Sequence, residues 1–445
     1  MKNTSDMTKG NPLKIMLYFS LPILLGNLFQ QFYNIVDSTV VGNVLGEDSF
    51  AAVGASSAIY LLIVSFANGM ANGFSIIGAR LFGAKNEKQL RQAFAMSILL
   101  SLIISVILTI VGHLILMPLL RALNTPDEII TESYSYIVII LSFIIITMFY
   151  NVLAGFLQAV GNSKMPLIFL IVASIVNVVL DLLFVAVFSM GVAGAAIATV
   201  ISQIVSLVLC IIYIVKKCPF LWIKKSDFII DKKLITELFS TGLSMALMFS
   251  IVNLGTVILQ SAINDFGKIT IAAHTAARKL SGVFMLPITT ITVAASTFVS
   301  QNYGAGQKKR VTTGVKDAFL LGAIWSAIAI FIVYGFGRLI IVGITGSEDV
   351  ELIALADRYL RVNLPFYPIL VVLCVLRNVL QSLGLKIIPL ISSSIELFGK
   401  VVVVYILVPR MDYFGVIISE PMIWVICAIL LSVTYIVQIQ KIMKA

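Results

Sequence analysis

The sequence predicts an all-α integral membrane protein. We expect twelve transmembrane helices in two six-helix bundles, related by a pseudo-twofold axis along the membrane normal. The first reason is composition: the 445 residues are 60% hydrophobic and 12% charged, with a mean hydropathy of +1.06. A water-soluble globular protein needs more polar surface than this. The other two reasons are a one-sided distribution of basic residues and an internal repeat.

Twelve apolar stretches are long enough to cross a bilayer, which takes about 20 residues of helix. Their approximate limits are 15–44, 51–78, 93–120, 133–158, 165–188, 192–215, 234–263, 270–299, 314–342, 358–382, 387–409 and 414–439. The first and seventh exceed the length of a perpendicular span, so we expect them to be tilted or bent. Pro22 is the expected hinge in the first span.

The basic residues gather on one side of these spans. With the N-terminus inside, 21 of the 31 Lys and Arg fall on the inner side, six on the outer side and four within spans. This bias matches the positive-inside rule. We therefore expect a multi-pass protein of a bacterial inner or plasma membrane, with both termini cytoplasmic. The surplus of positive charge then faces anionic lipid, and we expect no nucleic-acid partner.

The chain also repeats itself after half its length. Gly83-Ala84 recurs as Gly304-Ala305 at a separation of 221, and the motif at 157–161 recurs at 380–384, a separation of 223. Each half holds six spans, an even number, so both halves enter the membrane in the same direction. We expect an N-terminal lobe at 1–215, a cytoplasmic linker at 216–233 and a C-terminal lobe at 234–445. Two such lobes are typical of an alternating-access carrier, although a channel or a scaffold could use the same repeat.

Two carboxylates lie inside spans of the N-terminal lobe. Asp37 ends a polar stripe in span 1 that includes Asn34, and Asp181 shares a helix face with Asn177 in span 5. Both acids fall at similar depth, and no basic residue lies in that lobe's spans to pair with them. Ionisable groups in hydrocarbon are functional candidates by default, so we expect this pair to bind a proton or a cation. The alternative is that each acid only hydrogen-bonds to neighbouring helices.

The C-terminal lobe carries charges of both signs within its spans. Glu396 and Lys400 are spaced to neutralise each other along one helix. Arg278 and Glu420 fall at similar depth on different spans, so they could form a structural pair or take part in coupling. Arg377 lies near the cytoplasmic end of span 10, and we expect its side chain to extend to the interface.

Neutral polar, aromatic and methionine side chains form the candidate substrate surface. Such side chains make a soft lining suited to varied amphipathic ligands. At helical spacing the same residue types also serve as ordinary packing. The candidates are Gln30, Tyr33, Tyr150, Met245, Met248, Asn253, Gln260 and Met285.

Motifs for nucleotide hydrolysis, metal binding and nucleophilic catalysis are missing from the sequence. It holds no GxxxxGK[ST], HExxH or GxSxG motif. Its four cysteines have no paired spacing and its two histidines are far apart, so we expect no metal site and no cofactor. Asp37 and Asp181 could serve an intramembrane aspartyl enzyme, but neither stands in a GxGD-like context. We therefore expect a non-enzyme driven by an ion gradient, with H⁺ or Na⁺ as the coupling ion.

Several of these motifs together resemble the multidrug and toxic compound extrusion (MATE) family. They are Pro22 and Asp37, the Arg80-Leu-Phe-Gly-Ala loop with its echo Gln301-Asn-Tyr-Gly-Ala-Gly306, Asn177 with Asp181, and Glu420-Pro421. Their order and the twelve spans extend the resemblance over the whole chain. It implies a V-shaped carrier of two six-helix bundles that exchanges organic cations for protons or sodium.

The resemblance also implies where the coupling ion binds. One branch of the family is thought to use a span 1 Asp with a span 5 Asn and Asp, which match Asp37, Asn177 and Asp181; Asn34 lies on the same stripe. Another branch uses acids in spans 7 and 10, where this chain has none in the interior; Glu237 and Asp357 lie at the boundaries of those spans. The chain is thus more similar to the branch with an N-lobe ion site.

The expected function is a cation-coupled antiporter, with H⁺ favoured over Na⁺. It would export lipophilic, often cationic, drugs and toxic organic compounds by alternating access. The alternative is a flippase for lipid-linked precursors, which would need cations lining a cavity in both lobes. The expected partners are small organic substrates and membrane lipid, and we expect a monomer.

Overall fold

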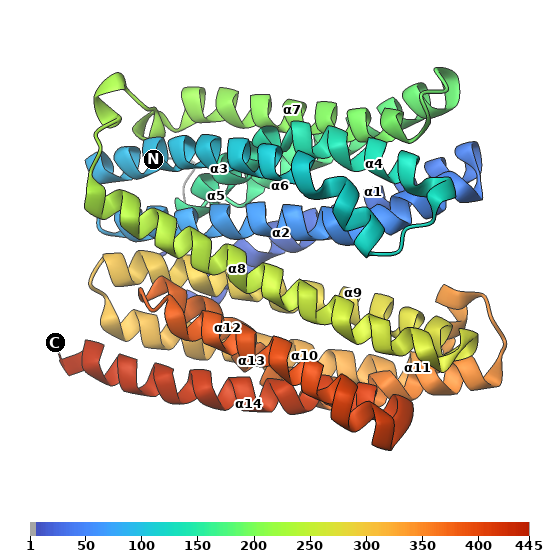
Figure 1. The fold of residues 1–445 in the computed structure, drawn as a ribbon. Coiled ribbons are helices and arrows are strands. Elements are labelled where there is room, and N and C mark those ends of the chain that lie inside the picture. Colours follow the sequence, from blue (N-terminus) through green and yellow to red (C-terminus); the bar gives the residue numbers. More distant parts are fainter. Residues whose placement is uncertain (1–5, 445) are drawn as a thin grey trace. The chain divides into compact units, whose positions relative to one another are not determined.

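The computed structural model describes residues 6–444, and within that range it contains helices and no strands. Its contacts group the chain into two compact units (Figure 1). Unit 1 is formed by residues 21–246 together with Asp6. Unit 2 is formed by Met7–Ser20 and by the chain from Leu247 onward.

Unit 1 is built from long apolar helices that run side by side (Figure 1). They are α1 (Pro12–Leu45) from Leu21 onward, α2 (Glu47–Gly83), α3 (Glu87–Ala122), α4 (Asp127–Ser142), α5 (Ile144–Ala159), α6 (Lys164–Asp181), α7 (Gly191–Lys217) and α8 (Lys232–Ile263) up to Ala246. A π-helical segment, Leu182–Val187, continues α6. Asn86 caps α3 by accepting a hydrogen bond from the backbone N–H of Gln89 at 3.1 Å.

Unit 2 repeats this arrangement with the second half of the chain. Its helices are the remainder of α8, α9 (Lys268–Gly304), α10 (Lys308–Thr345), α11 (Val350–Asn363), α12 (Tyr367–Ser382), α13 (Ile387–Val402) and α14 (Val408–Lys444), with the start of α1. A π-helical segment, Val403–Leu407, joins α13 to α14. Short 3-10 turns lie at Pro219–Leu221, Lys225–Asp227, Asn264–Phe266 and Leu364–Phe366.

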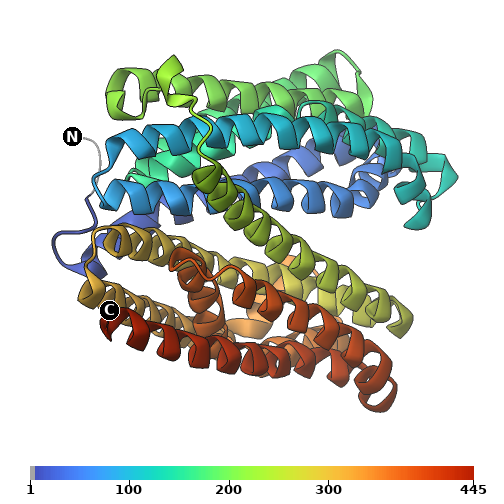
Figure 2. The same cartoon turned by 60° about the vertical axis from the view of Figure 1, so that its left-hand side comes forward.

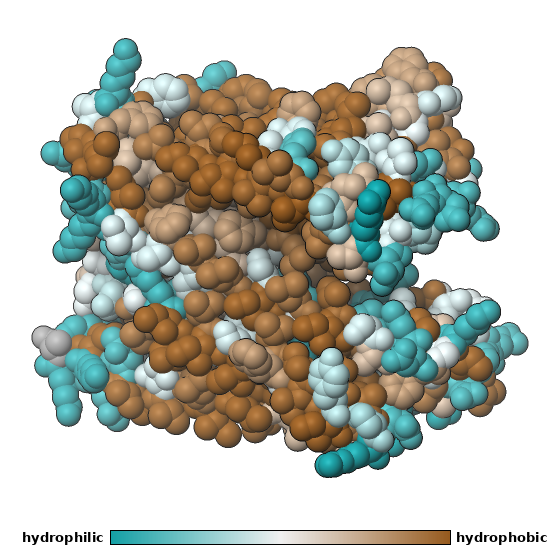
Figure 3. All heavy atoms as spheres, viewed as in Figure 1, coloured by the Kyte–Doolittle hydropathy of each residue, from teal (hydrophilic) through white to brown (hydrophobic). Residues whose placement is uncertain are grey.

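The twelve predicted spans are confirmed within residues 6–444. Ten helical segments are long and apolar enough to cross a membrane, and the bent pair α4 and α5 makes an eleventh span. The last of the ten, Ile387–Lys444, contains two spans, because Asp412 breaks the helix with a φ of 51°. Hydrophobic side chains cover the middle of the face in Figure 3, and hydrophilic ones gather at its two ends.

The break between α4 and α5 has no proline or glycine to mark it in the sequence. The two helices meet at Phe143 and are bent by 50°. Thr109 of α3 donates a hydrogen bond to the carbonyl oxygen of Leu141 at 3.0 Å. A partner from a neighbouring helix therefore satisfies a carbonyl next to the bend, as burial in lipid requires.

The sequence repeat reappears in the helix boundaries. At a separation of 221, α2 and α9 start at Glu47 and Lys268 and end at Gly83 and Gly304. At a separation of 223, α5 and α12 start at Ile144 and Tyr367 and end at Ala159 and Ser382. The π-helical segments start at Leu182 and Val403, again 221 apart. Each half therefore follows one helical plan, including its local irregularities.

The N-terminal segment is bound within unit 2. Gln301 accepts a hydrogen bond from the backbone N–H of Met7 at 3.0 Å. Arg310 donates to the carbonyl oxygens of Met7 and Gly10 at 2.9 and 2.8 Å, and to Asn302 at 2.9 Å. Met7 is fully buried. We name these contacts the N-terminal clasp; Figure 2 shows the segment beside the ends of α9 and α10.

In unit 1, the linker and the start of α8 are held by similar contacts to α2 and α3. Asp227 forms an ion pair of 3.5 Å with Arg91 of α3, and Glu237 of α8 forms one of 2.7 Å with Arg80 of α2. The start of each half is thus held by the loop region of the other half. By their contacts, Met7–Ser20 belongs to unit 2, and the linker with the start of α8 belongs to unit 1. The lobes 1–215 and 234–445 follow from the repeat alone and stay a prediction.

The start of α8 packs directly on α2 through small residues. Gly69 and Gly73 of α2 form a GxxxG pattern, and they face Ala246 and Gly242 of α8. Small residues at this spacing let two membrane helices approach backbone to backbone. Helix α1 passes from unit 2 to unit 1 between Ser20 and Leu21, next to Pro22, which is buried inside the continuous helix.

Candidate functional site

A polar cavity of about 80 Å³ lies inside unit 1. Its walls come from α1, α2, α5, α6 and α7, and its polar lining is neutral: Gln30, Tyr33, Tyr60, Asn68, Thr147, Tyr150, Asn151, Ser174, Asn177, Thr199, Ser202, Gln203 and Ser206. Some of these groups bind one another. Asn151 donates to Asn68 at 2.7 Å, and Thr147 donates to Gln203.

Asp37 and Asp181 face each other beside this cavity. Asp181 is the last residue of α6, is fully buried and directly precedes the π-helical segment, a distortion often found at functional sites. The two carboxyl groups interact, and Tyr33, Tyr60 and Tyr136 lie within electrostatic range of them. We call these five residues the acidic cluster.

The carboxylates of this cluster lack donors. Within the described chain, both oxygens of Asp181 and one oxygen of Asp37 are buried without a hydrogen-bond partner. When both acids are ionised neither can donate, so no hydrogen bond can join them. One proton or one cation between the two carboxylates would compensate their repulsion. The arrangement can therefore hold such a ligand.

The two predicted asparagines differ in their placement. Asn177 lines the polar cavity one helical turn before Asp181; it is 1% exposed, and its amide oxygen and nitrogen have no partner within residues 6–444. Asn34 is exposed and does not line the cavity. The structure thus brings Asp37 and Asp181 together, places Asn177 one helical turn from Asp181, and leaves Asn34 outside the cavity.

The predicted substrate residues divide between the two units. Gln30, Tyr33 and Tyr150 line the polar cavity of unit 1, and Met285 lines a cavity in unit 2. Met245 and Met248 are 2% and 1% exposed, and they, Asn253 and Gln260 line neither cavity. Gln260 instead donates to Asn264 at 3.1 Å. Neither of these two cavities is lined by all eight predicted residues.

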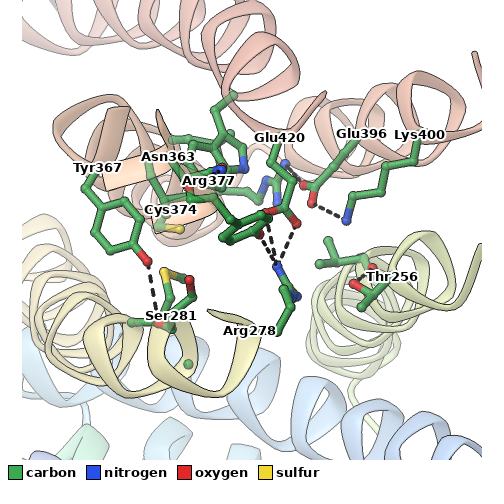
Figure 4. A pocket seen from close by; sticks show the side chains of 17 residues that line it. Thr256, Arg278, Ser281, Asn363, Tyr367, Cys374, Arg377, Glu396, Lys400 and Glu420 are labelled. Carbon is green, nitrogen blue, oxygen red and sulfur yellow. Dashed lines mark hydrogen bonds and ion pairs between the residues drawn. The ribbon is translucent and has the colours of Figure 1, made fainter. Parts of the chain in front are cut away.

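The cavity in unit 2 has a volume of about 200 Å³ and an ionic lining (Figure 4). Nη1 of Arg278 lies 2.8 and 3.0 Å from the two carboxylate oxygens of Glu420. The hydroxyl of Tyr359 donates to the same carboxylate at 2.9 Å. Arg278 and Glu420 therefore form an ion pair in the structure. The sequence left open whether this pair is structural or takes part in coupling.

A second carboxylate in this cavity has two basic partners. Glu396 lies 3.4 Å from Nζ of Lys400, the pair expected from their spacing, and 3.0 Å from Nη2 of Arg377. The prediction that Arg377 extends to the interface is wrong. Its side chain is buried and also donates to Ser392 at 3.0 Å. A carboxylate within reach stabilises the guanidinium inside the unit, and sequence position alone does not show such a partner.

Sequence reasoning missed most of the neutral polar residues of the unit 1 site. Those with larger side chains are Tyr60, Asn68, Tyr136, Asn151 and Gln203. The signal was present, because each is a polar side chain within an otherwise apolar span. Neutral polar residues are common in such spans, and the sequence alone does not show which of them line one cavity.

Comparison with protein families identifies the kind of chain that carries these sites. The MatE family model matches residues 22–183 and 244–406. The probable multidrug resistance protein YpnP of Bacillus subtilis is 29% identical over 393 residues, covering 88% of this chain and 87% of that protein. The probable multidrug resistance protein YoeA of the same organism is 26% identical, covering 94% and 92%.

Solved structures share the fold over the full length. An outward-facing multidrug resistance MATE family transporter of the MOP superfamily matches with a TM-score of 0.90 and 23% identity, covering 100% of this chain and 99% of that one. A MATE structure in the bent conformation matches with a TM-score of 0.91 and 23% identity, covering 98% of each chain. At this identity the likeness establishes the helical plan.

Proposed function

Since the chain belongs to the MatE family, whose members are membrane transporters, we propose that it is a cation-coupled antiporter. It exports lipophilic, often cationic, organic compounds by alternating access. The observation that carries this proposal is the acidic cluster of unit 1, where Asp181 faces Asp37 without a hydrogen-bond donor. The chain is a multi-pass membrane protein, and its relatives in Bacillus support a bacterial cell membrane.

The cluster supplies the charge change that exchange requires. Two adjacent carboxylates in a low-dielectric interior are stable only when a bound positive charge compensates them. A proton, a metal cation or a cationic substrate can each provide that charge. If the coupling ion and the substrate favour opposite states of the carrier, the binding of one displaces the other. Pro22 gives α1 a place to bend as the occupancy of Asp37 changes.

We favour the proton as the coupling ion. The neighbours of the carboxyl groups are phenol hydroxyls and the amide of Asn177, which can donate to or accept from either protonation state. A sodium ion would instead need several oxygen ligands arranged around it. Sodium is kept as the alternative, because the amide and phenol oxygens could take part in such a shell.

The coupling is tested by ethidium transport in proteoliposomes. Transport is measured first under an imposed proton gradient and then under a sodium gradient. We expect the proton gradient to drive uptake, and we expect Asp37→Asn and Asp181→Asn to abolish it while leaving insertion and folding intact. Asp48→Asn, at an exposed acid near the start of α2, is the matched control. Wild-type transport by Asp37→Asn would contradict the proposal, and transport that follows only sodium would identify the other ion.

A flippase for lipid-linked precursors receives no support from these observations. The spans of the N-terminal lobe carry no basic residue to bind a phosphate head group. The relatives described above are named as multidrug resistance proteins. We therefore propose small organic substrates, with the protein acting as a monomer in the lipid and both termini in the cytoplasm.

A further inference from the structure

The two cavities lie at equivalent positions of the internal repeat. Separations of 221 and 223 residues relate lining residues of the polar cavity in unit 1 to lining residues of the ionic cavity in unit 2. The pairs are Tyr60 and Ser281, Val64 and Met285, Thr147 and Leu370, Tyr150 and Leu373, Asn151 and Cys374, Ala173 and Glu396, Asn177 and Lys400, Thr199 and Glu420, and Gln203 and Trp424. The fold therefore builds the same site twice.

The charges of the two copies differ. Asn177, which lines the cavity beside the acidic cluster in unit 1, corresponds to Lys400 in unit 2. Ala154 and Ser57, at the same separations, correspond to Arg377 and Arg278. The second copy has thus gained three basic groups where the first has none.

These basic groups exceed the acids that face them. The ionic cavity is lined by Arg278, Arg377 and Lys400 and by two carboxylates, Glu396 and Glu420. The only histidine of unit 2, His274, does not line it. One positive charge is left without a counter-charge among the lining residues. An uncompensated charge inside a membrane protein costs several kcal/mol, so an additional anion would stabilise this site.

Donors are available for such an anion. The hydrogen bonds of Arg278 all use Nη1, so within the described chain its Nε and Nη2 groups have no protein partner. Among the described residues, Lys400 forms one ion pair, the 3.4 Å contact with Glu396, and no hydrogen bond, although the residue is only 2% exposed. Nε of Arg377 is buried without a partner. Figure 4 shows Arg278 and Lys400 extending toward the space beside Glu420 and Glu396.

We infer that this cavity is a second ligand site, which binds the carboxylate group of an organic anion or zwitterion. A guanidinium and an ammonium together offer charge-assisted hydrogen bonds to a carboxylate. The volume of about 200 Å³ lies below the ~300–1,000 Å³ of whole-ligand pockets, so it suits one acidic group with a small apolar body. Trp424, Tyr367 and Leu370 supply an apolar wall for that body.

The site extends the substrate class of the transporter. The acidic cluster of unit 1 favours positive charge, and the ionic cavity of unit 2 favours negative charge. A carrier with both sites accepts substrates that bear an acidic group as well as simple organic cations. Naming the ligand a substrate rests on the proposed export function, whereas the binding of a carboxylate does not.

Three ligands of one shape test the inference in the purified full-length protein in detergent. Benzoate, benzamide and benzamidine share a ring and differ in carrying negative, neutral and positive charge. Trp424 lines the cavity, and Trp222 and Trp325 are the other two tryptophans. In a Trp222→Phe, Trp325→Phe background, the fluorescence of Trp424 reports binding. We expect saturable binding of benzoate, at least tenfold tighter than of benzamide, and none of benzamidine.

Two substitutions should change benzoate affinity in opposite directions. Lys400→Met removes the surplus charge but keeps an apolar stem, so we expect at least tenfold weaker binding. Glu396→Gln removes a competing carboxylate and should tighten binding. Lys268→Met, at an exposed lysine that does not line the cavity, is the matched control and should leave affinity unchanged. Melting temperatures identify any variant that fails to fold.

The inference is overturned if benzoate and benzamide bind alike, or if folded Lys400→Met binds benzoate as the wild type does. The second result would mean that Lys400 does not bind the carboxylate. The assay needs neither a membrane nor a gradient. If ethidium transport is independent of Asp37 and benzoate still binds, the proposed coupling fails and the second site stands. If transport depends on Asp37 and benzoate does not bind, the reverse holds.

Discussion

A methyl group added at Gly73 should destabilise unit 1, because α2 and α8 leave no space for it. A Cβ atom at Gly73 would collide with Cα of Gly242 and would lie 2.6 Å from its backbone nitrogen and 2.7 Å from the carbonyl carbon of Thr241. These are backbone atoms of a neighbouring helix, which cannot turn aside as a flexible side chain can. Gly73→Ala must therefore push the two helices apart.

Gly54, in the same helix, provides the matched control. A Cβ atom there meets no atom within 4 Å. Both Gly→Ala substitutions make the same helical gain of about 0.5–1 kcal/mol. The difference between the two variants therefore isolates the collision, and overpacking of this kind costs about 1–3 kcal/mol. Because only backbone absorbs it, we expect the upper part of that range.

Thermal unfolding of the purified variants in detergent measures the difference. We expect Gly73→Ala to melt several degrees below the wild type and Gly54→Ala to melt at or above it. Equal melting temperatures for the two variants would refute the close approach of α2 to the start of α8. The same result would remove the reason for the small residues at Gly69 and Ala246.

Three further outcomes follow from the structure. Arg310→Ala removes the hydrogen bonds of the N-terminal clasp, so limited proteolysis should cut the segment before α1 faster than in the wild type, and an unchanged rate would argue against the clasp. A cysteine near Lys225 should be labelled only from the cytoplasm and one near Glu47 only from outside, and any reversal would invert the proposed orientation. Lower pH should weaken the binding of a cationic drug in detergent, because protons compete with the drug at the acidic cluster. Asp37→Asn should imitate the low-pH state. Drug binding that depends on sodium and not on pH would exclude the proton as the coupling ion.

The positions of the helices follow from the sequence because hydrocarbon imposes a minimum apolar length. The predicted span 51–78 lies inside α2, Glu47–Gly83. The apolar stretch ends at the membrane boundary, whereas the helix continues beyond it, from the residue after Gly46 to Gly83. The bend at Phe143 was not predicted, because the groups that satisfy it lie on α3 and leave no mark near residue 143 in the sequence.

The acidic cluster was predictable in part. Asp37 and Asp181 stand out as carboxylates in apolar spans, and their similar depth predicted that they lie close together. Asn34 shares a stripe with Asp37, but helical periodicity does not show which residues of that stripe line the cavity. The ionic cavity needed the structure, because Arg377 and Tyr359, which bind Glu396 and Glu420, lie on helices other than those of the two acids.

The N-terminal clasp affects the order in which the chain can fold during synthesis. Met7 is held by Arg310, which lies 303 residues further along the chain. At ~5–20 residues per second, a ribosome makes Arg310 roughly 15–60 s after Met7. During that interval Met7–Ser20 has to wait without the surface that buries it, although the rest of α1 can already pack in unit 1. A chain that stops in the linker would therefore leave this segment exposed to the proteases that remove incomplete membrane proteins.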